Sequence, residues 1–217
     1  MNKKEITKRY ILFIISLFFI ALGIAFTKKS ILGISPNSSI PNVFSLRFTH
    51  VSLGTWLILY NVIMVILQVL ILRRDFKLIQ LLQIPLSVVF GYFTDFGVWC
   101  LSSFEIHSYI MQLVMVFIGV IVLAFGIALS VIANVIMNSA EAFVKAISDR
   151  TGKKFGNVKV VVDIANVAIS VILSLVFFGG EIIGTREGTF ISAVCTGLVV
   201  KVFIKLLEEP VSRLLEK

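Results

Sequence analysis

Charged residues are scarce in this sequence. Asp, Glu, Lys and Arg make up 15% of its 217 residues, whereas soluble proteins carry about 25%. Hydrophobic residues make up 58%, which is more than a soluble fold of this length buries, since soluble folds are about 45–50% apolar. We therefore expect lipid to cover part of the surface. We also expect residues 1–217 to form a single transmembrane domain, without a separate soluble domain.

Residues that build metal centres, disulfides and catalytic sites are equally scarce. The two cysteines lie in different apolar segments, and the two histidines lie in predicted outer loops. No His, Cys, Asp or Glu spacing matches a metal site, and no glycine-rich loop with Lys-Ser or Lys-Thr indicates nucleotide binding. The sequence therefore predicts neither an enzyme nor a cofactor or metal. No basic-aromatic stripe indicates nucleic acid as a partner.

Six apolar segments are long enough to cross a membrane, which takes about 20 mostly apolar residues. The first resembles a secretory signal, but Lys28 and Lys29 stand where small residues would form a cleavage site, so we expect an uncleaved helix. Pro85 interrupts the third segment, where we expect a kink. The predicted spans are residues 10–27, 53–72, 78–98, 109–132, 158–178 and 189–207.

Positive charges are unevenly distributed among the predicted loops. An N-terminus on the inner side places all but four of the 20 Lys and Arg residues inside, and the four outside are Lys28, Lys29, Arg47 and Arg186. Cytoplasmic loops of membrane proteins carry such an excess. The distribution predicts an inner-membrane protein with both termini in the cytoplasm. It also accounts for the net charge of +8 without an acidic partner.

The two halves of the chain resemble each other weakly. Leu-Gly-Ile-Ala at residues 22–25 recurs as Phe-Gly-Ile-Ala at residues 125–128, and at similar spacings Gly54 matches Gly156 and Gly91 matches Gly197. Each half, at about residues 8–100 and 108–207, contains a span, a short helix and two further spans. Because three spans are an odd number, the second half must be inverted. We predict an all-α membrane protein of six transmembrane helices in two inverted three-helix repeats, each with an additional short interfacial or re-entrant helix. Transporters are often built this way.

Each predicted short helix begins with residues typical of helix N-termini. Ser35 is a suitable N-cap, followed by Pro36 at the first helical position. Asn138 would cap the second short helix, and Glu141 would complete a capping box three residues later. These residues either satisfy free backbone amides only, or belong to two helix N-termini that line a polar entrance from each side. Flanking charges place both short helices near the membrane surface.

Asp163 lies inside the fifth predicted span, where a carboxylate costs about 2.5–3.5 kcal/mol. Asn61 occupies the corresponding position in the first half, and Asn166 lies one turn beyond Asp163. Lys159 lies one turn before Asp163 and would neutralise it as an i,i+4 pair. The alternative is a substrate or proton-coupling site formed by Asn61, Asp163 and Asn166.

Residues 179–189 form an outer loop with four glycines and a charged pair, Arg186 and Glu187. This segment either makes a tight turn that carries a surface ion pair, or it offers backbone amides and Arg186 to an anionic group. The candidate site residues are thus Ser35, Asn61, Asn138, Glu141, Asp163, Asn166, Arg186 and Glu187.

Three stretches of the chain resemble the YczE/YyaS/YitT family of bacterial membrane proteins. They are residues 22–36, residues 149–152 (Asp-Arg-Thr-Gly) and above all residues 179–189, which contain the Arg-Glu-Gly-Thr motif of its YyaS-like branch. The resemblance covers nearly the whole chain, although family members often have Gly-Pro where this chain has Asn138 and Ser139. It implies a multi-pass protein of the bacterial cell membrane, for which a transport role is generally assumed.

These observations favour a secondary transporter of a small polar or anionic solute. Asp163 would couple protons or bind a cationic group, and Arg186 would guide the solute at the outer mouth. The alternative is a non-transporting scaffold or regulator of envelope or secondary-metabolite machinery, and a channel would need a continuous pore, which no sequence pattern indicates. The expected partners are the lipid bilayer and a small solute. The solute, the direction, the coupling ion and the oligomeric state are not specified by the sequence.

Overall fold

The computed structural model describes residues 3–216, and the regular secondary structure within this range is entirely helical, without strands. Six helical segments are long and apolar enough to cross a membrane, which confirms the predicted all-α class and the number of spans. The helices are α1 (Lys3–Lys29), α2 (Pro36–Arg47), α3 (Leu53–Leu72), α4 (Gln83–Cys100), α5 (Tyr109–Ala133), α6 (Ser139–Thr151), α7 (Phe155–Phe177) and α8 (Glu187–Glu216), with 3₁₀ turns η1 (Arg73–Asp75) and η2 (Leu78–Leu82) between α3 and α4.

The predicted spans match the helices most closely in the middle of the chain. α3 has the predicted ends, whereas α1 begins before the apolar run and α8 continues beyond it. Lys, Arg and Glu are good helix formers, so they extend a helix that an apolar run has started. Pro85 lies in the first turn of α4, directly after η2. The expected interruption is therefore a change from 3₁₀ to α geometry, because a first turn tolerates a residue without an amide hydrogen.

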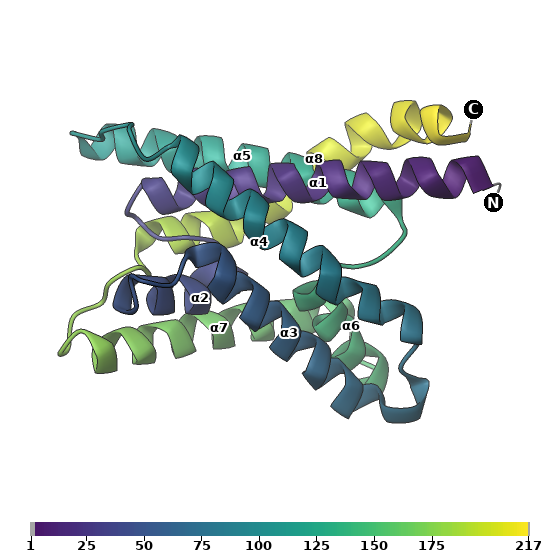
Figure 1. Cartoon of the computed structure of the whole chain (residues 1–217), viewed down its shortest axis with the longest axis horizontal. Helices are drawn as coiled ribbons and strands as arrows, with labels where there is room; N and C mark the ends of the chain where they lie inside the picture. The colour runs from purple at the N-terminus through teal and green to yellow at the C-terminus, as the bar shows by residue number, and fades with distance from the viewer. Residues whose placement is uncertain (1–2, 217) are drawn as a thin grey trace.

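The helices form two layers joined by α4 (Figure 1). In one layer α5 packs against both α1 and α8. In the other, α2 and α6 each pack against α3 and α7. α4 runs obliquely across both layers and packs against α1 and α3. The two ends of the chain lie close together at the same end of the bundle, where Lys8 Nζ donates to the carbonyl oxygen of Leu214 at 3.3 Å.

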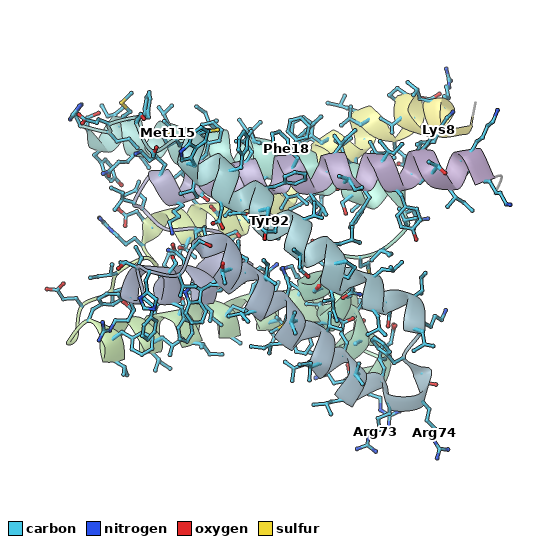
Figure 2. The ribbon with its side chains drawn as sticks, viewed as in Figure 1. Lys8, Phe18, Arg73, Arg74, Tyr92 and Met115 are labelled. Atoms are coloured by element: carbon cyan, nitrogen blue, oxygen red, sulfur yellow. The ribbon has the colours of Figure 1, made fainter. Side chains whose placement is uncertain are left out.

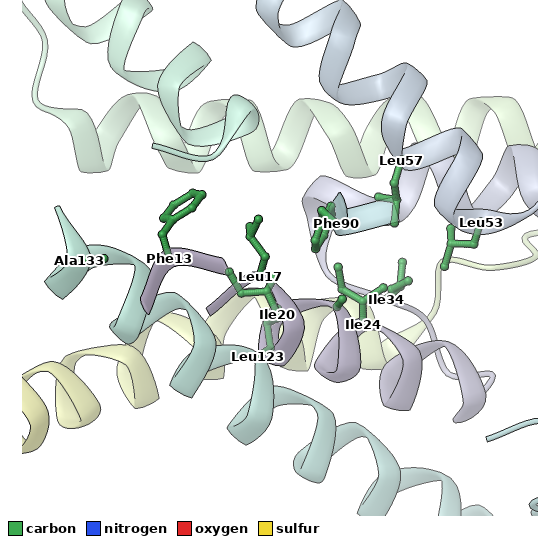
Figure 3. Packing of buried hydrophobic residues seen from close by; sticks show 11 residues of the cluster. Phe13, Leu17, Ile20, Ile24, Ile34, Leu53, Leu57, Phe90, Leu123 and Ala133 are labelled. Carbon is green, nitrogen blue, oxygen red and sulfur yellow. The ribbon is translucent and has the colours of Figure 1, made fainter. Parts of the chain in front are cut away.

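The apolar core lies between α1, α3, α4 and α5 (Figure 3). Ile20 of α1 belongs to one buried cluster with Leu57 of α3, Phe90 of α4 and Leu123 of α5. Small residues let these helices approach at backbone distance, as in many membrane proteins. A Cβ added at Gly23 of α1 would meet a backbone nitrogen of α5 at 2.5 Å. A residue larger than glycine at position 23 would therefore force the central helices α1 and α5 apart.

A polar contact fixes α3 against α4. Asp95 of α4 accepts a hydrogen bond from the backbone nitrogen of Gly54 at 2.7 Å and another from Ser52 Oγ at 2.6 Å. A Cβ added at Gly54 would meet the carbonyl oxygen of Gly91 at 2.1 Å. Gly156 and Gly197, which the repeat pairs with Gly54 and Gly91, have open space instead. α3 and α4 are therefore in close contact at Gly54 and Gly91, whereas a Cβ added at Gly156 or Gly197 would meet no atom within 4 Å.

The outer faces of the helices are apolar, as a lipid-facing surface requires. Figure 2 shows side chains projecting all around the bundle, with Phe18 and Tyr92 among those labelled. α7 and α8 are the least buried of the six long helices. Lys8, Arg73 and Arg74 project at the end of the bundle where the two chain ends lie (Figure 2). The chain is a multi-pass membrane protein, and the cytoplasmic location of this basic end stays a prediction.

Candidate functional site

A cavity of about 440 Å³ lies between the two layers, and side chains from all eight α-helices line it. Its walls are largely apolar, with Leu57, Phe90 and Leu123 among them. Polar and charged side chains enter it from α2, α3, α6, α7 and α8. Small-molecule sites typically have volumes of about 300–1,000 Å³ and combine apolar walls with a few polar groups. The cavity has the dimensions and composition of such a site.

The two short helices both begin at this cavity. Ser35 and Asn37 line it from the start of α2, and Asn138 and Glu141 line it from the start of α6. The helices run outward from it toward opposite ends of the bundle (Figure 1). The N-termini of both short helices therefore lie inside the bundle, which favours the re-entrant over the interfacial alternative, and their depth in the membrane stays a prediction. The charges that suggested a shallow position, such as Arg47, belong to the far ends of these helices.

The predicted side-chain caps are wrong, although the predicted starting residues are right. Ser35 makes no hydrogen bond to the α2 backbone and donates to Ser38 Oγ at 3.2 Å instead. Asn138 makes none to α6, and Glu141 does not close a capping box. The first three amides of a helix have no intrahelical acceptor. Those of α6 find no other acceptor in the described part of the chain, and two of the residues that carry them, Ala140 and Glu141, line the cavity.

Lys159 and Asp163 form an ion pair on the wall of the cavity. Lys159 Nζ lies 2.5 Å from Asp163 Oδ1, and the two side chains are 27% and 22% exposed. With the Asn37 amide assigned to satisfy both its ends, its nitrogen donates to Asp163 Oδ1 and its oxygen accepts from Lys159 Nζ, each at 3.2 Å. Lys159 thus neutralises Asp163 as the first alternative predicted, and the pair lies on the cavity wall. The role of Asp163 in a substrate or proton-coupling site stays a prediction.

The two predicted asparagines have different positions. Asn61 is buried in α3 and lines the cavity. Asn166 lies behind the wall, where its Oδ1 accepts a hydrogen bond from Tyr60 at 3.1 Å and its carbonyl oxygen accepts one from Ser39 at 3.3 Å. Tyr60 in turn lines the cavity. Asn166 therefore holds a lining residue and the start of α2 in place.

Arg186 and Glu187 do not reach the cavity. They pair with each other at 3.1 Å and are 46% and 40% exposed. The adjoining residues instead dock on the segment that leads into α2, since Thr189 Oγ1 accepts a hydrogen bond from the backbone nitrogen of Ile34 at 3.2 Å. The geometry matches the interpretation of this loop as a turn with a surface ion pair. The role of Arg186 at an outer mouth stays a prediction.

Two hydroxyl groups on α8 were missed in the sequence. Ser192 and Thr196 line the cavity, and neither hydroxyl oxygen has a hydrogen-bond partner among the described residues. Ser192 is only 1% exposed. Hydroxyl residues at positions i and i+4 lie on one face of a helix. The spacing of Ser192 and Thr196 within an apolar span could therefore have predicted a polar face on α8.

A pair of glutamines closes the bundle next to the start of α6. Gln68 Nε2 donates to Gln83 Oε1 at 3.1 Å, and Gln83 Nε2 donates to Gln68 Oε1 at 3.3 Å. Gln68 also donates to the carbonyl oxygen of Ser139 at 3.0 Å. Beside this pair only about 10 Å³ is free, which is room for about one water. Beyond it lies a second cavity of about 310 Å³ with Lys77 and Lys145 in its wall.

Helices of membrane-spanning length around an internal cavity with polar and charged groups define the chain as a multi-pass membrane protein. It belongs to a family of unknown function, DUF6198, whose model matches residues 7–205. Neither the curated proteins nor the solved structures gave a significant match. The resemblance to the YczE/YyaS/YitT family stays a prediction, and any function must be argued from the cavity itself.

Proposed function

We propose that this protein is a secondary transporter that carries a small polar or anionic solute across the bacterial inner membrane. The observation that carries the proposal is the cavity of about 440 Å³ between the layers, where both short helices begin and where Glu141, Lys159 and Asp163 lie. Ionisable groups at membrane depth are expensive, and they usually mark a substrate or ion pathway.

The proposal includes two inverted repeats, at about residues 8–100 and 108–207. Helix packing supports this arrangement, because each short helix packs against the middle span of the other half: α2 against α7, and α6 against α3. The first spans of the two halves, α1 and α5, pack together at the centre. In transporters built from inverted repeats, the substrate site lies near the midplane where the repeats meet. The cavity has that position in the proposed arrangement.

Access to the cavity in the proposed transport cycle changes at the Gln68–Gln83 pair. Gln83 of this pair lines the second cavity near the basic end of the bundle, and in the proposed cycle the closed pair keeps that cavity apart from the larger one. Positive residues at that end support a cytoplasmic location. Opening of this pair would connect the solute site to the cytoplasm.

Proteoliposomes test the proposal. Liposomes with and without the purified protein are loaded with a defined mixture of carboxylates, amino acids, amines and sugars, and the remaining contents are measured by mass spectrometry over time. The proposal predicts selective loss of at least one solute class from protein-containing liposomes. Equal retention in both preparations, with and without a proton gradient, would contradict transport and favour a scaffold or regulator.

A further inference from the structure

We infer that the cavity binds the monoanion of a small carboxylic acid together with one proton on Glu141, and that the free amides at the start of α6 hold the carboxylate. The inference rests on the proposed transport function and names its substrate class and coupling ion. Proton and anion enter and leave together, so no net charge crosses the membrane.

Glu141 is the carboxylate in the cavity that lacks a partner. It makes no ion pair or hydrogen bond with any residue that the structure describes, although it lines the cavity and is half-buried. The nearby charged group of opposite sign is Lys159, which is already bound to Asp163. Glu141 is thus free to exchange a proton with the cavity.

The surroundings of Glu141 favour its protonated form. Burial raises its pKa, the charge of Asp163 raises it further, and Lys159 opposes both effects. α6 packs against α3 and α7. The titratable groups that face Glu141 from those helices are Tyr60 of α3 and the Lys159–Asp163 pair of α7. Since that pair is neutral as a unit, the charge of the site depends mainly on Glu141.

The remaining charges of the site suit one anion when Glu141 is protonated. The starts of α2 and α6 each contribute about half an elementary positive charge, and helix N-termini bind carboxylates through their free amides. Such amides are available at Ala140 and Glu141, both of which line the cavity. Ionisation of Glu141 would add a negative charge in the same helical turn and repel the bound carboxylate. Proton loss and anion release are therefore coupled.

A second observation points independently to a bound molecule. Ser192, on the opposite wall formed by α8, is 1% exposed, and its hydroxyl has no partner among the described residues. Buried hydroxyls are nearly always hydrogen-bonded. A ligand in the cavity would supply the missing partner. Apolar side chains such as Leu57, Phe90 and Leu123 surround these polar groups, so the ligand is an organic acid with an apolar body.

Thermal stability of the purified full-length protein tests the inference, with butyrate and butylamine as probes of equal size and opposite charge. The range runs from neutral to alkaline pH, where butyrate itself stays ionised. Butyrate is expected to raise the melting temperature, and its apparent affinity is expected to fall by about tenfold per pH unit above the pKa of Glu141.

Glu141→Gln keeps the shape of the protonated side chain. This variant is expected to bind butyrate with little pH dependence and to lose proton-driven butyrate uptake in proteoliposomes. Glu209→Gln is the matched control, because Glu209 is an exposed glutamate that pairs with Arg213 on α8 and lines neither cavity. It is expected to behave like the wild type. The melting temperature without ligand shows whether each variant is folded.

Stabilisation by butylamine that disappears in Glu141→Gln would overturn the inference and assign a cation site, while the transport proposal would survive. An unchanged pH dependence in Glu141→Gln would overturn the role of Glu141. If neither probe binds but the solute mixture reveals selective flux of another class, the inference alone fails. If no solute is transported at all, the proposed function fails as well.

Discussion

Lys159 and Asp163 are joined by a 2.5 Å ion pair on the wall of an internal cavity, one helical turn apart on α7. The pair explains how a carboxylate is tolerated inside a spanning helix. It also separates the roles of the two acidic residues at the cavity. Asp163 is neutralised within the protein, whereas Glu141 lacks a partner in the described residues and is left for proton exchange.

Removal of one member of the pair should destabilise the protein more than removal of both. Asp163→Asn leaves the Lys159 ammonium without its counter-charge. We expect a loss of about 1–3 kcal/mol, less than the 3–5 kcal/mol of fully buried pairs, because the side chains keep 27% and 22% of their exposure. The double variant Lys159→Gln with Asp163→Asn should recover part of this loss.

Unfolding of the two single variants and the double variant in detergent gives the coupling energy of the pair. A double variant that is no more stable than Asp163→Asn would contradict the self-neutralising pair. Flux measured on the same double variant separates structure from coupling. If the pair is structural, flux persists in the double variant. Complete loss of flux in a folded double variant would return proton coupling to Asp163.

The contact between Gly33 and Thr189 should set the position of α2. Gly33 has φ +118°, and a Cβ there would meet Thr189 Oγ1 at 2.3 Å. Gly180 has φ +100° but open space around it, so Gly180→Ala measures the backbone strain alone. We expect Gly33→Ala to be the more destabilising change, by about 1–3 kcal/mol, because overpacking adds to strain.

Thermal unfolding of Gly33→Ala and Gly180→Ala under identical conditions makes this comparison. Similar melting temperatures for the two variants would show that the outer loop does not lock the segment before α2. In that case residues 179–189 would be available for the anion contact that the sequence also allowed.

Ser192→Ala should stabilise the empty protein while weakening the binding of its ligand. A buried hydroxyl without a partner is unfavourable by about 1–3 kcal/mol, so its removal should raise the melting temperature. Ser170 is the control, since it is equally buried but donates to the carbonyl oxygen of Val167 at 2.8 Å and lies 3.0 Å from Thr185 Oγ1. Ser170→Ala should lower the melting temperature.

The two serine variants are compared with and without butyrate. A merely structural Ser192 would leave the butyrate-induced shift unchanged, and a lower melting temperature for Ser192→Ala would mean that its hydroxyl is bonded. Either result would remove the independent support for a ligand in the cavity.

The spans and several cavity residues were accessible from the sequence because they depend on composition. Apolar runs of membrane length fixed the six helices, with α3 predicted at both ends. Asp163 and Asn61 were found because polar residues stand out in apolar runs, and both line the cavity. Asn166 was found in the same way, but its side chain lies behind the wall. Whether a polar residue faces a cavity or its neighbours depends on packing.

Local motifs were less informative than composition. The Asn138–Glu141 spacing predicted a capping box. This motif describes hydrogen bonds within a single helical turn and takes no account of the helices around it. In the bundle the same turn faces a cavity shared by all eight helices, and its side chains do not cap it. The burial of the α2 and α6 N-termini inside the bundle was missed for a similar reason, since charges near the ends of a segment do not show which end enters the core. These properties arise from contacts between distant parts of the chain.

The central claim is that solute passes through the cavity, and flux through Gly197→Leu tests it most directly. Gly197 lines the cavity, and a Cβ there would meet no atom within 4 Å, so the position has open space for a side chain. We expect the leucine side chain to occupy part of the cavity. Gly156→Leu is the control, because Gly156 also has open space but lies outside the cavity wall.

In proteoliposomes we expect Gly197→Leu to lower solute flux by about tenfold, which corresponds to about 1.4 kcal/mol. Gly156→Leu should retain the flux of the wild type. Equal flux in Gly197→Leu and the wild type, with both proteins folded, would contradict passage through this cavity.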